Sequence, residues 1–286
     1  MTEHRLANGI PPAWADGWGE DRFGAYLVLR YGEAMQRLRW VPPGDFVMGS
    51  PKEEQGRFDR EIEHRVTLTE GLWLGEVPCT QAFWEAVTGE NPSRFQSPQR
   101  PVESVSFDRV DAFLDALQSA RPEWNLRLPT EAEWEWACRA GTQAATYAGD
   151  LEILGGRNAP VLDPLAWYGG NSGMDFDLEA GGSADWKGKQ HDFAQAGSRV
   201  VKGKRPNAWG LHDTLGNVWE WCSDRYGPYT GEDEVNPRGP AAGSGRVMRG
   251  GSWISNARFV RAAYRDAIPP DYRSGSVGFR LARGPS

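Results

Sequence analysis

The sequence predicts an α+β domain with little regular secondary structure. Among its 286 residues are 35 glycines and 20 prolines, a high density of residues that interrupt helices and strands. Its 14 tryptophans can supply core area that long helices would otherwise provide. A chain of this length can bury a sizeable core, and its 39% hydrophobic and 25% charged residues are typical of a globular protein.

The first part of the chain predicts short strands after a polar arm. Residues 1–22 are polar, and we expect them to extend over the body of the protein. Residues 26–31 and 35–41 predict two strands on either side of Gly32. In the second strand Gln36, Leu38 and Trp40 lie on one face, and Arg37 and Arg39 lie on the other. This two-residue period is typical of a half-buried strand. Further strands are expected at 46–50, 64–69 and 72–75.

Three short helices are predicted from their first residues. Thr80 caps a helix that ends at Gly89, and Ser106 caps a second helix that carries an apolar stripe. Thr130 and Glu133 form a capping box for a third helix, in which each side chain can accept the other residue's backbone N–H. This helix is expected to run to residue 140, because glycine follows it.

Beyond residue 141 the pattern becomes weaker. Residues 142–206 are rich in glycine and aspartate and are expected to be mostly loop. Residues 207–222 and 245–282 regain a strong pattern, and the alternating tryptophans of 216–221 predict a strand pressed on a core.

Charge and cysteine content exclude several classes of protein. A net charge of −7 argues against binding to a nucleic-acid backbone, which needs a basic face. The first residues contain no apolar signal region and no stretch is apolar enough to span a membrane, so we expect no membrane association. Three isolated cysteines predict free thiols rather than disulfides, and free thiols are typical of the reducing cytoplasm. We therefore expect a cytoplasmic protein. We also expect a monomer.

Eight segments carry a family resemblance, and they occur in order along the chain. They are residues 46–50, 77–81, 91–93, 101–102, 127–136, 216–221, 249–253 and 278–281. Together they resemble the formylglycine-generating-enzyme domain, also called the sulfatase-modifying-factor domain, over about residues 38–283. The resemblance implies an irregular C-type-lectin-like α+β fold. We therefore expect an N-terminal arm and strand extension at 1–37, and a domain at 38–286 whose residues 246–282 form a variable region.

The resemblance also implies a structural calcium ion. The matching positions are the side chains of Asp213 and Glu220 and the carbonyls of Gly216 and Val218. Calcium prefers oxygen ligands, and these four form a partial shell if a tight turn brings them together. The alternative is that Glu220 pairs with an arginine and Asp213 is merely exposed.

The family's catalytic groups are missing from this chain. The resemblance implies that its oxidases need two cysteines five residues apart, which bind copper; the matching positions are Ser255 and Val260. A second branch consists of iron enzymes with three histidine ligands, largely from an additional domain. The chain has only four scattered histidines and no GxSxG nucleophile motif. We expect neither copper nor iron, and enzyme activity is disfavoured.

Residues 254–276, called here the C-terminal segment, resemble the variable region of a diversity-generating-retroelement protein. In such proteins mutagenic reverse transcription rewrites selected codons and yields no Lys, Glu, Gln, Met or Trp; the C-terminal segment contains none of these five. Tyr, Phe, Ser, Asn and Gly supply rigid contact area and adaptable hydrogen bonds, as in antibody loops. The interchangeable residues, called here the variable positions and expected to be exposed, are Ile254, Ser255, Asn256, Phe259, Tyr264, Asp266, Ile268, Tyr272, Ser274, Gly275 and Ser276.

Interspersed arginines are expected to belong to the fixed scaffold. Arg261 and Arg265 can bridge to carboxylates inside the fold, whereas ligand anchoring is the alternative role. The sequence thus predicts a non-catalytic protein that binds a protein ligand of unknown identity. The alternatives are an oxidoreductase of the formylglycine-generating-enzyme family and an inactive paralogue with a fixed partner. Reaction with thiol peptides that depends on Cys222 would favour the oxidoreductase.

Overall fold

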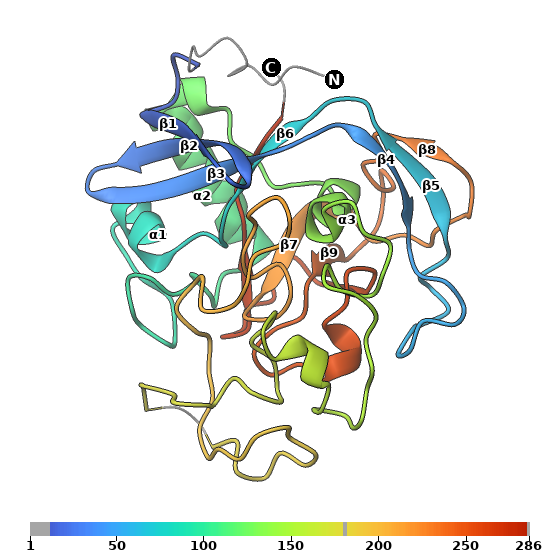
Figure 1. The fold of residues 1–286 in the computed structure, drawn as a ribbon. Helices are drawn as coiled ribbons and strands as arrows, with labels where there is room; N and C mark the ends of the chain where they lie inside the picture. Colours follow the sequence, from blue (N-terminus) through green and yellow to red (C-terminus); the bar gives the residue numbers. More distant parts are fainter. Residues whose placement is uncertain (1–11, 180–181, 285–286) are drawn as a thin grey trace.

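A five-stranded sheet forms one side of the molecule (Figure 1). The computed structural model describes residues 12–179 and 182–284. The sheet has the order β1-β2-β3-β6-β12, and all four pairings are antiparallel. Its last strand comes from the C-terminus, so the two ends of the chain meet in one sheet. The strands are β1 (Gly17–Asp21), β2 (Gly24–Tyr31), β3 (Ala34–Val41), β6 (Leu72–Gly75) and β12 (Ala282–Arg283).

The predicted arm is partly a strand. Residues 17–21 pair with β2 and extend the sheet, while residues 1–11 of the arm lie outside the described part of the chain. The hairpin between β2 and β3 turns at Gly32, which has a φ of 57° that favours glycine. The expected division at residue 37 falls inside β3. Because β3 pairs with both β2 and β6, the first strands are part of the same sheet as the rest of the domain.

The strand β3 was expected to be half-buried, and Met35 and Arg37 on its outer face do keep accessible surface, but Arg39 on the same face is buried. Leu38 is fully buried on one face, and Arg39 on the other face is only 2% exposed. Arg39 donates hydrogen bonds to Glu76 and to Asp21, with distances of 2.6 to 2.9 Å. Paired carboxylates allow the guanidinium to be buried, and alternation alone does not reveal such partners.

Two smaller sheets complete the β-structure. A three-stranded sheet has the order β4-β5-β8, and a four-stranded sheet has the order β10-β9-β7-β11, in which only β7 and β11 are parallel. The first contains β4 (Gly44–Met48), β5 (His64–Leu68) and β8 (Glu234–Val235). The second contains β7 (Trp219–Arg225), β9 (Arg246–Arg249), β10 (Arg265–Ile268) and β11 (Val277–Phe279).

The three predicted helices are confirmed, together with their caps. Thr80 accepts a hydrogen bond from the third residue beyond it, Ser106 does the same, and Thr130 forms the capping box with Glu133. The third helix ends one residue early, because Ala140 already has a left-handed φ of 47°. The helices are α1 (Gln81–Thr88), α2 (Phe107–Ala120) and α3 (Glu131–Arg139), with short 3-10 turns η1 (Pro122–Trp124), η2 (Pro160–Leu162) and η3 (Ala257–Phe259).

Long loops cover the lower part of the view in Figure 1. Between residues 142 and 206, η2 is the only helix or strand in the described part of the chain, which agrees with the predicted loop. None of the helices within residues 12–179 and 182–284 is long and apolar enough to cross a lipid bilayer.

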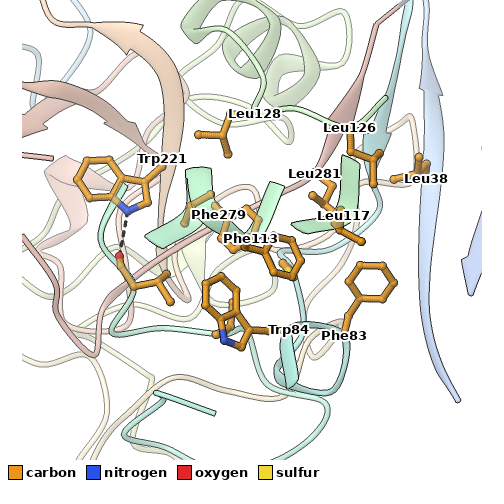
Figure 2. Packing of buried hydrophobic residues seen from close by; sticks show 14 of the residues in the cluster. Leu38, Phe83, Trp84, Phe113, Leu117, Leu126, Leu128, Trp221, Phe279 and Leu281 are labelled. Atoms are coloured by element: carbon orange, nitrogen blue, oxygen red, sulfur yellow. Dashed lines mark hydrogen bonds between the residues drawn. The ribbon is translucent and has the colours of Figure 1, made fainter. Parts of the chain in front are cut away.

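Aromatic residues dominate the main core (Figure 2). Trp84 of α1 stacks on Phe113 of α2 with ring centroids 4.7 Å apart, and Phe279 of β11 meets both rings edge-on. Trp221 of β7 is fully buried and donates to the carbonyl of Val105 at 3.1 Å. The tryptophans therefore join helices to strands that are distant in sequence.

A buried carboxylate supports the start of α3. Asp224 accepts the backbone N–H of Glu131 at 2.9 Å and is only 3% exposed. Burial, with the nearby Glu131 carboxylate as a smaller cause, raises the pKa of Asp224 from 3.8 to about 7. The folded protein thus holds this proton to a higher pH than the unfolded chain does.

The expected consequence is a pH-dependent loss of stability. Unfolding releases the Asp224 proton between about pH 4 and pH 7, so the free energy of unfolding falls as pH rises through that window. Asp224→Asn keeps the amide oxygen as an acceptor and should flatten this slope in urea titrations from pH 4 to 8. Asp59→Asn, at an exposed carboxylate, should keep the wild-type slope. Parallel curves for wild type and Asp224→Asn would contradict the assignment.

Candidate ligand-binding site

The C-terminal segment lies between the strands β9 and β11, which both belong to the four-stranded sheet. β9 precedes it and pairs with β7 and β10, while β11 follows it and pairs with β7. Gly250 and Gly251 make the exit from β9, with φ values of 93° and 75°. A Cβ on either glycine would lie 2.9 Å from a backbone oxygen, so larger residues do not fit there.

Buried arginines tie the segment and its borders to the body of the protein. Arg261 donates to Glu61 at 2.7 and 2.9 Å and also pairs with Glu54. Arg265 binds both carboxylate oxygens of Glu131. These contacts confirm the expected scaffold role for both arginines, because their carboxylate partners lie outside the variable region.

Arg249 fixes the backbone of the segment directly. Its guanidinium donates to the carbonyls of Ala262, Ala263 and Tyr264 and pairs with Glu135 of α3. The side chain is fully buried. One arginine of β9 therefore sets the path of three residues in the segment.

Nine of the eleven variable positions have accessible surface. Ile254 and Tyr272 are 40% and 48% exposed. Seven others are half-buried: Asn256, Phe259, Asp266, Ile268, Ser274, Gly275 and Ser276. The segment thus leaves aromatic, aliphatic and small polar groups accessible along its length.

Two variable positions are buried, which corrects the expectation that all eleven are exposed. Ser255 is 6% exposed, and its hydroxyl accepts the N–H of Ser252 at 3.0 Å. Tyr264 is 4% exposed and packs on Phe259 and Trp219, with ring centroids 4.9 and 5.7 Å away. Composition does not separate inward from outward residues in an irregular loop, since no period relates them.

Residues outside the segment also contact its side chains, and no pattern in the sequence predicted them. Phe58 stacks on Phe259 at 6.0 Å, and Arg60 donates to the hydroxyl of Tyr264 at 2.8 Å. Both come from the loop between β4 and β5, about two hundred residues earlier. On another side Trp253 donates its indole N–H to the carbonyl of Gly275 at 2.8 Å.

The predicted calcium ligands are engaged within the fold. Glu220 accepts two hydrogen bonds of 2.6 Å from Arg280 and one of 2.6 Å from Trp134, the arginine pairing that was the open alternative. Asp213 is buried, not exposed, and accepts from the backbone N–H of Lys202 and the amide of Asn217. The Glu220 carboxylate already has three donors and fits a cation poorly in this arrangement. Calcium at Asp213, Gly216, Val218 and Glu220 stays a prediction.

The three cysteines lie away from solvent. Cys79, Cys138 and Cys222 are fully buried and free. Burial raises the pKa of the Cys138 thiol to about 12 and raises those of Cys79 and Cys222 as well. A protonated, inaccessible thiol is a poor nucleophile and metal ligand. Cys222 is thus poorly placed to replace the family's catalytic cysteines.

We expect native protein to be unreactive toward a thiol reagent. In Ellman's assay the folded chain should release almost no chromophore over minutes, whereas protein in guanidinium chloride should react at Cys79, Cys138 and Cys222. Rapid reaction of one thiol in the folded protein would show an accessible cysteine and would reopen the thiol-chemistry alternative.

The histidines form no shared centre in the described part of the chain. His64 contacts the carbonyl of Ile62 at 3.0 Å, and His191 contacts Asp163 at 3.0 Å. His212 contacts the carbonyl of Lys204, and burial lowers its pKa. His4 lies outside the described residues. Each of the three has its own local partner, as expected for packed or surface histidines.

Comparison with known proteins identifies the class. Residues 32–285 match the domain described as sulfatase-modifying factor enzyme 1-like, and the chain belongs to this family. The formylglycine-generating enzyme of Streptomyces coelicolor is 37% identical over 212 residues, which are 70% of this chain and 58% of that protein. Inactive C-alpha-formylglycine-generating enzyme 2 of Mus musculus is 31% identical, over 72% of this chain and 56% of that protein. The chain thus spans little more than half the length of these relatives.

Solved structures agree with this class. The structure of Treponema denticola variable protein 1 matches with a TM-score of 0.72 and 29% identity, and covers 91% of this chain and 99% of that chain. PvdO from Pseudomonas aeruginosa matches with a TM-score of 0.66 and 23% identity, which supports the fold alone. The predicted fold class, an irregular C-type-lectin-like α+β fold of the formylglycine-generating-enzyme type, is confirmed.

Proposed function

We propose that the chain is a non-catalytic ligand-binding protein whose C-terminal segment forms a diversifiable surface for a protein ligand. The observation that carries the proposal is the division of this segment into two sets of residues. Buried arginines and the border glycines fix the path of the backbone. Nine variable positions have accessible surface, and a change of side chain at these positions breaks no buried arginine–carboxylate pair. Aromatic and small polar side chains on a rigid base are the composition of an adaptable binding face.

Two further observations support binding over catalysis. Ser255 and Val260 occupy the positions of the family's reactive cysteines, and both are buried. The chain is similar over nearly its whole length to a variable protein from Treponema denticola. We place the protein in the cytoplasm, where its three free thiols suit the reducing environment.

Sequencing the 3′ end of this gene in sibling isolates tests the proposal. We expect substitutions at the variable positions, with Arg249, Arg261 and Arg265 unchanged because their guanidiniums hold buried carboxylates. Substitutions scattered evenly over the segment, buried arginines included, would sink the proposal. Invariant sequence across isolates would favour an inactive paralogue with one fixed partner, a reading that the similarity to an inactive mouse relative keeps open.

A further inference from the structure

A column of fixed aromatic rings lies against the C-terminal segment. Trp186 stacks on Trp253 with ring centroids 5.9 Å apart, and Phe95 meets Trp253 edge-on at 5.2 Å. Trp253 is 7% exposed and is bonded to Gly275 of the segment. Trp186 and Phe95 lie outside the variable region, so this column stays the same whatever the variable positions contain.

Arg157 sits at one end of the column, beside the segment. Its guanidinium carbon lies 4.9 Å from the centre of the Trp186 ring. A Cβ placed on Gly169 would lie 2.8 Å from the carbonyl oxygen of Ser255 and 2.9 Å from the Arg157 side chain. The Arg157 side chain and the Ser255 carbonyl are therefore neighbours. The backbone of Ala257 also donates to the carbonyl of Gly156 at 2.9 Å. Arg157 therefore borders residues 255–257.

Arg157 differs from the buried arginines of the scaffold in having no carboxylate. Arg249, Arg261 and Arg265 each pair with glutamates, whereas no hydrogen bond or ion pair joins the Arg157 guanidinium to any of the described residues. The Nε atom of Arg157 is buried without a hydrogen-bond partner. Burial, with no compensating carboxylate, lowers the pKa of the Arg157 guanidinium. A half-buried guanidinium without an acceptor is costly in the free protein, so the site favours an incoming anion.

We propose that Arg157 is a fixed receptor for a side-chain carboxylate of the protein ligand. The guanidinium, which lies over the Trp186 ring, can offer two parallel N–H groups to an aspartate or glutamate. Ligands of this chain then share an acidic residue, while the variable positions select what surrounds that residue. The inference rests on the proposed function, because it assumes that the ligand docks on the C-terminal segment.

Selection of peptides tests the inference. A displayed library of random seven-residue peptides is panned on the full chain and on Arg157→Gln, with Arg238→Gln as a control at an exposed arginine that shares a pocket with Arg265 and not with Arg157. Selected peptides are then synthesised with amidated C-termini, so that only side chains carry carboxylates. Their affinities are measured for each variant, for Arg157→Lys, and for Ile254→Ser and Tyr272→Ser.

The inference expects peptides that contain Asp or Glu and whose affinity falls about tenfold with Arg157→Gln, a loss typical of a charged hydrogen-bonded pair. Arg238→Gln should have no effect, and Arg157→Lys should restore part of the affinity. Peptides that need Ile254 or Tyr272 but lack acidic residues, or ignore Arg157→Gln, would overturn the inference and leave the proposed function intact. The absence of any peptide that depends on Ile254 or Tyr272 would count against both.

Discussion

Replacement of Arg249 by alanine is expected to lower the free energy of unfolding by about 3–5 kcal/mol, the usual cost of removing one partner of a buried ion pair. The substitution leaves the Glu135 carboxylate buried without this partner and removes the donors to the carbonyls of Ala262, Ala263 and Tyr264. Urea titration followed by tryptophan fluorescence measures the change. The middle of the C-terminal segment, around residues 262–264, should also become more accessible to amide hydrogen exchange.

The matched control is Arg238→Ala, at an exposed arginine. Its free energy of unfolding should stay within about 0.5 kcal/mol of the wild-type value. Equal losses for Arg249→Ala and Arg238→Ala would mean that the buried arginine has no special structural role. The division between scaffold and variable positions would then lose its main support.

Replacement of Trp84 by alanine is expected to cost a similar amount, about 3–5 kcal/mol, for a different reason. Trp84 is 1% exposed and packs against both Phe113 of α2 and Phe279 of β11 (Figure 2). Alanine would leave a cavity at the junction of both helices with the strand that follows the segment. The loss is measured by the same urea titration.

Trp18→Ala removes an equally large side chain from an exposed position in β1. Trp18 is 46% exposed, so its replacement should change the free energy of unfolding by less than about 1 kcal/mol. If both tryptophan variants lost the same stability, the packing between α1, α2 and β11 would not be the main source of stability in this region.

Local signals in the sequence were sufficient for the three helices. Thr80, Ser106 and Thr130 each begin a helix because a side-chain oxygen next to an apolar stripe satisfies a free N–H of the first turn. Two-residue alternation predicted the strand at 35–41, whereas β1 lies within the residues expected to be an extended arm. The family resemblance then supplied the fold class, which composition alone left open.

Partners that are distant in sequence could not be predicted. Arg39 alternates like a surface residue but is buried, because Glu76 and Asp21 approach it from other strands. Tyr264 looks like a contact residue and lies inward, because Phe58 and Trp219 cover it. Arg157 and Trp186 belong to a loop without periodicity, and only the folded chain brings them to the segment.

Residues 246–283 come after the strands and carboxylates that they contact. β11 pairs with β7, β12 pairs with β6, and Arg261 reaches Glu61 two hundred residues earlier. During translation the earlier sheets therefore keep open edges and unpaired carboxylates until residues 246–283 have left the ribosome. We expect a chain truncated before residue 246 to lack the C-terminal segment and, at the same time, the strands that close these sheets.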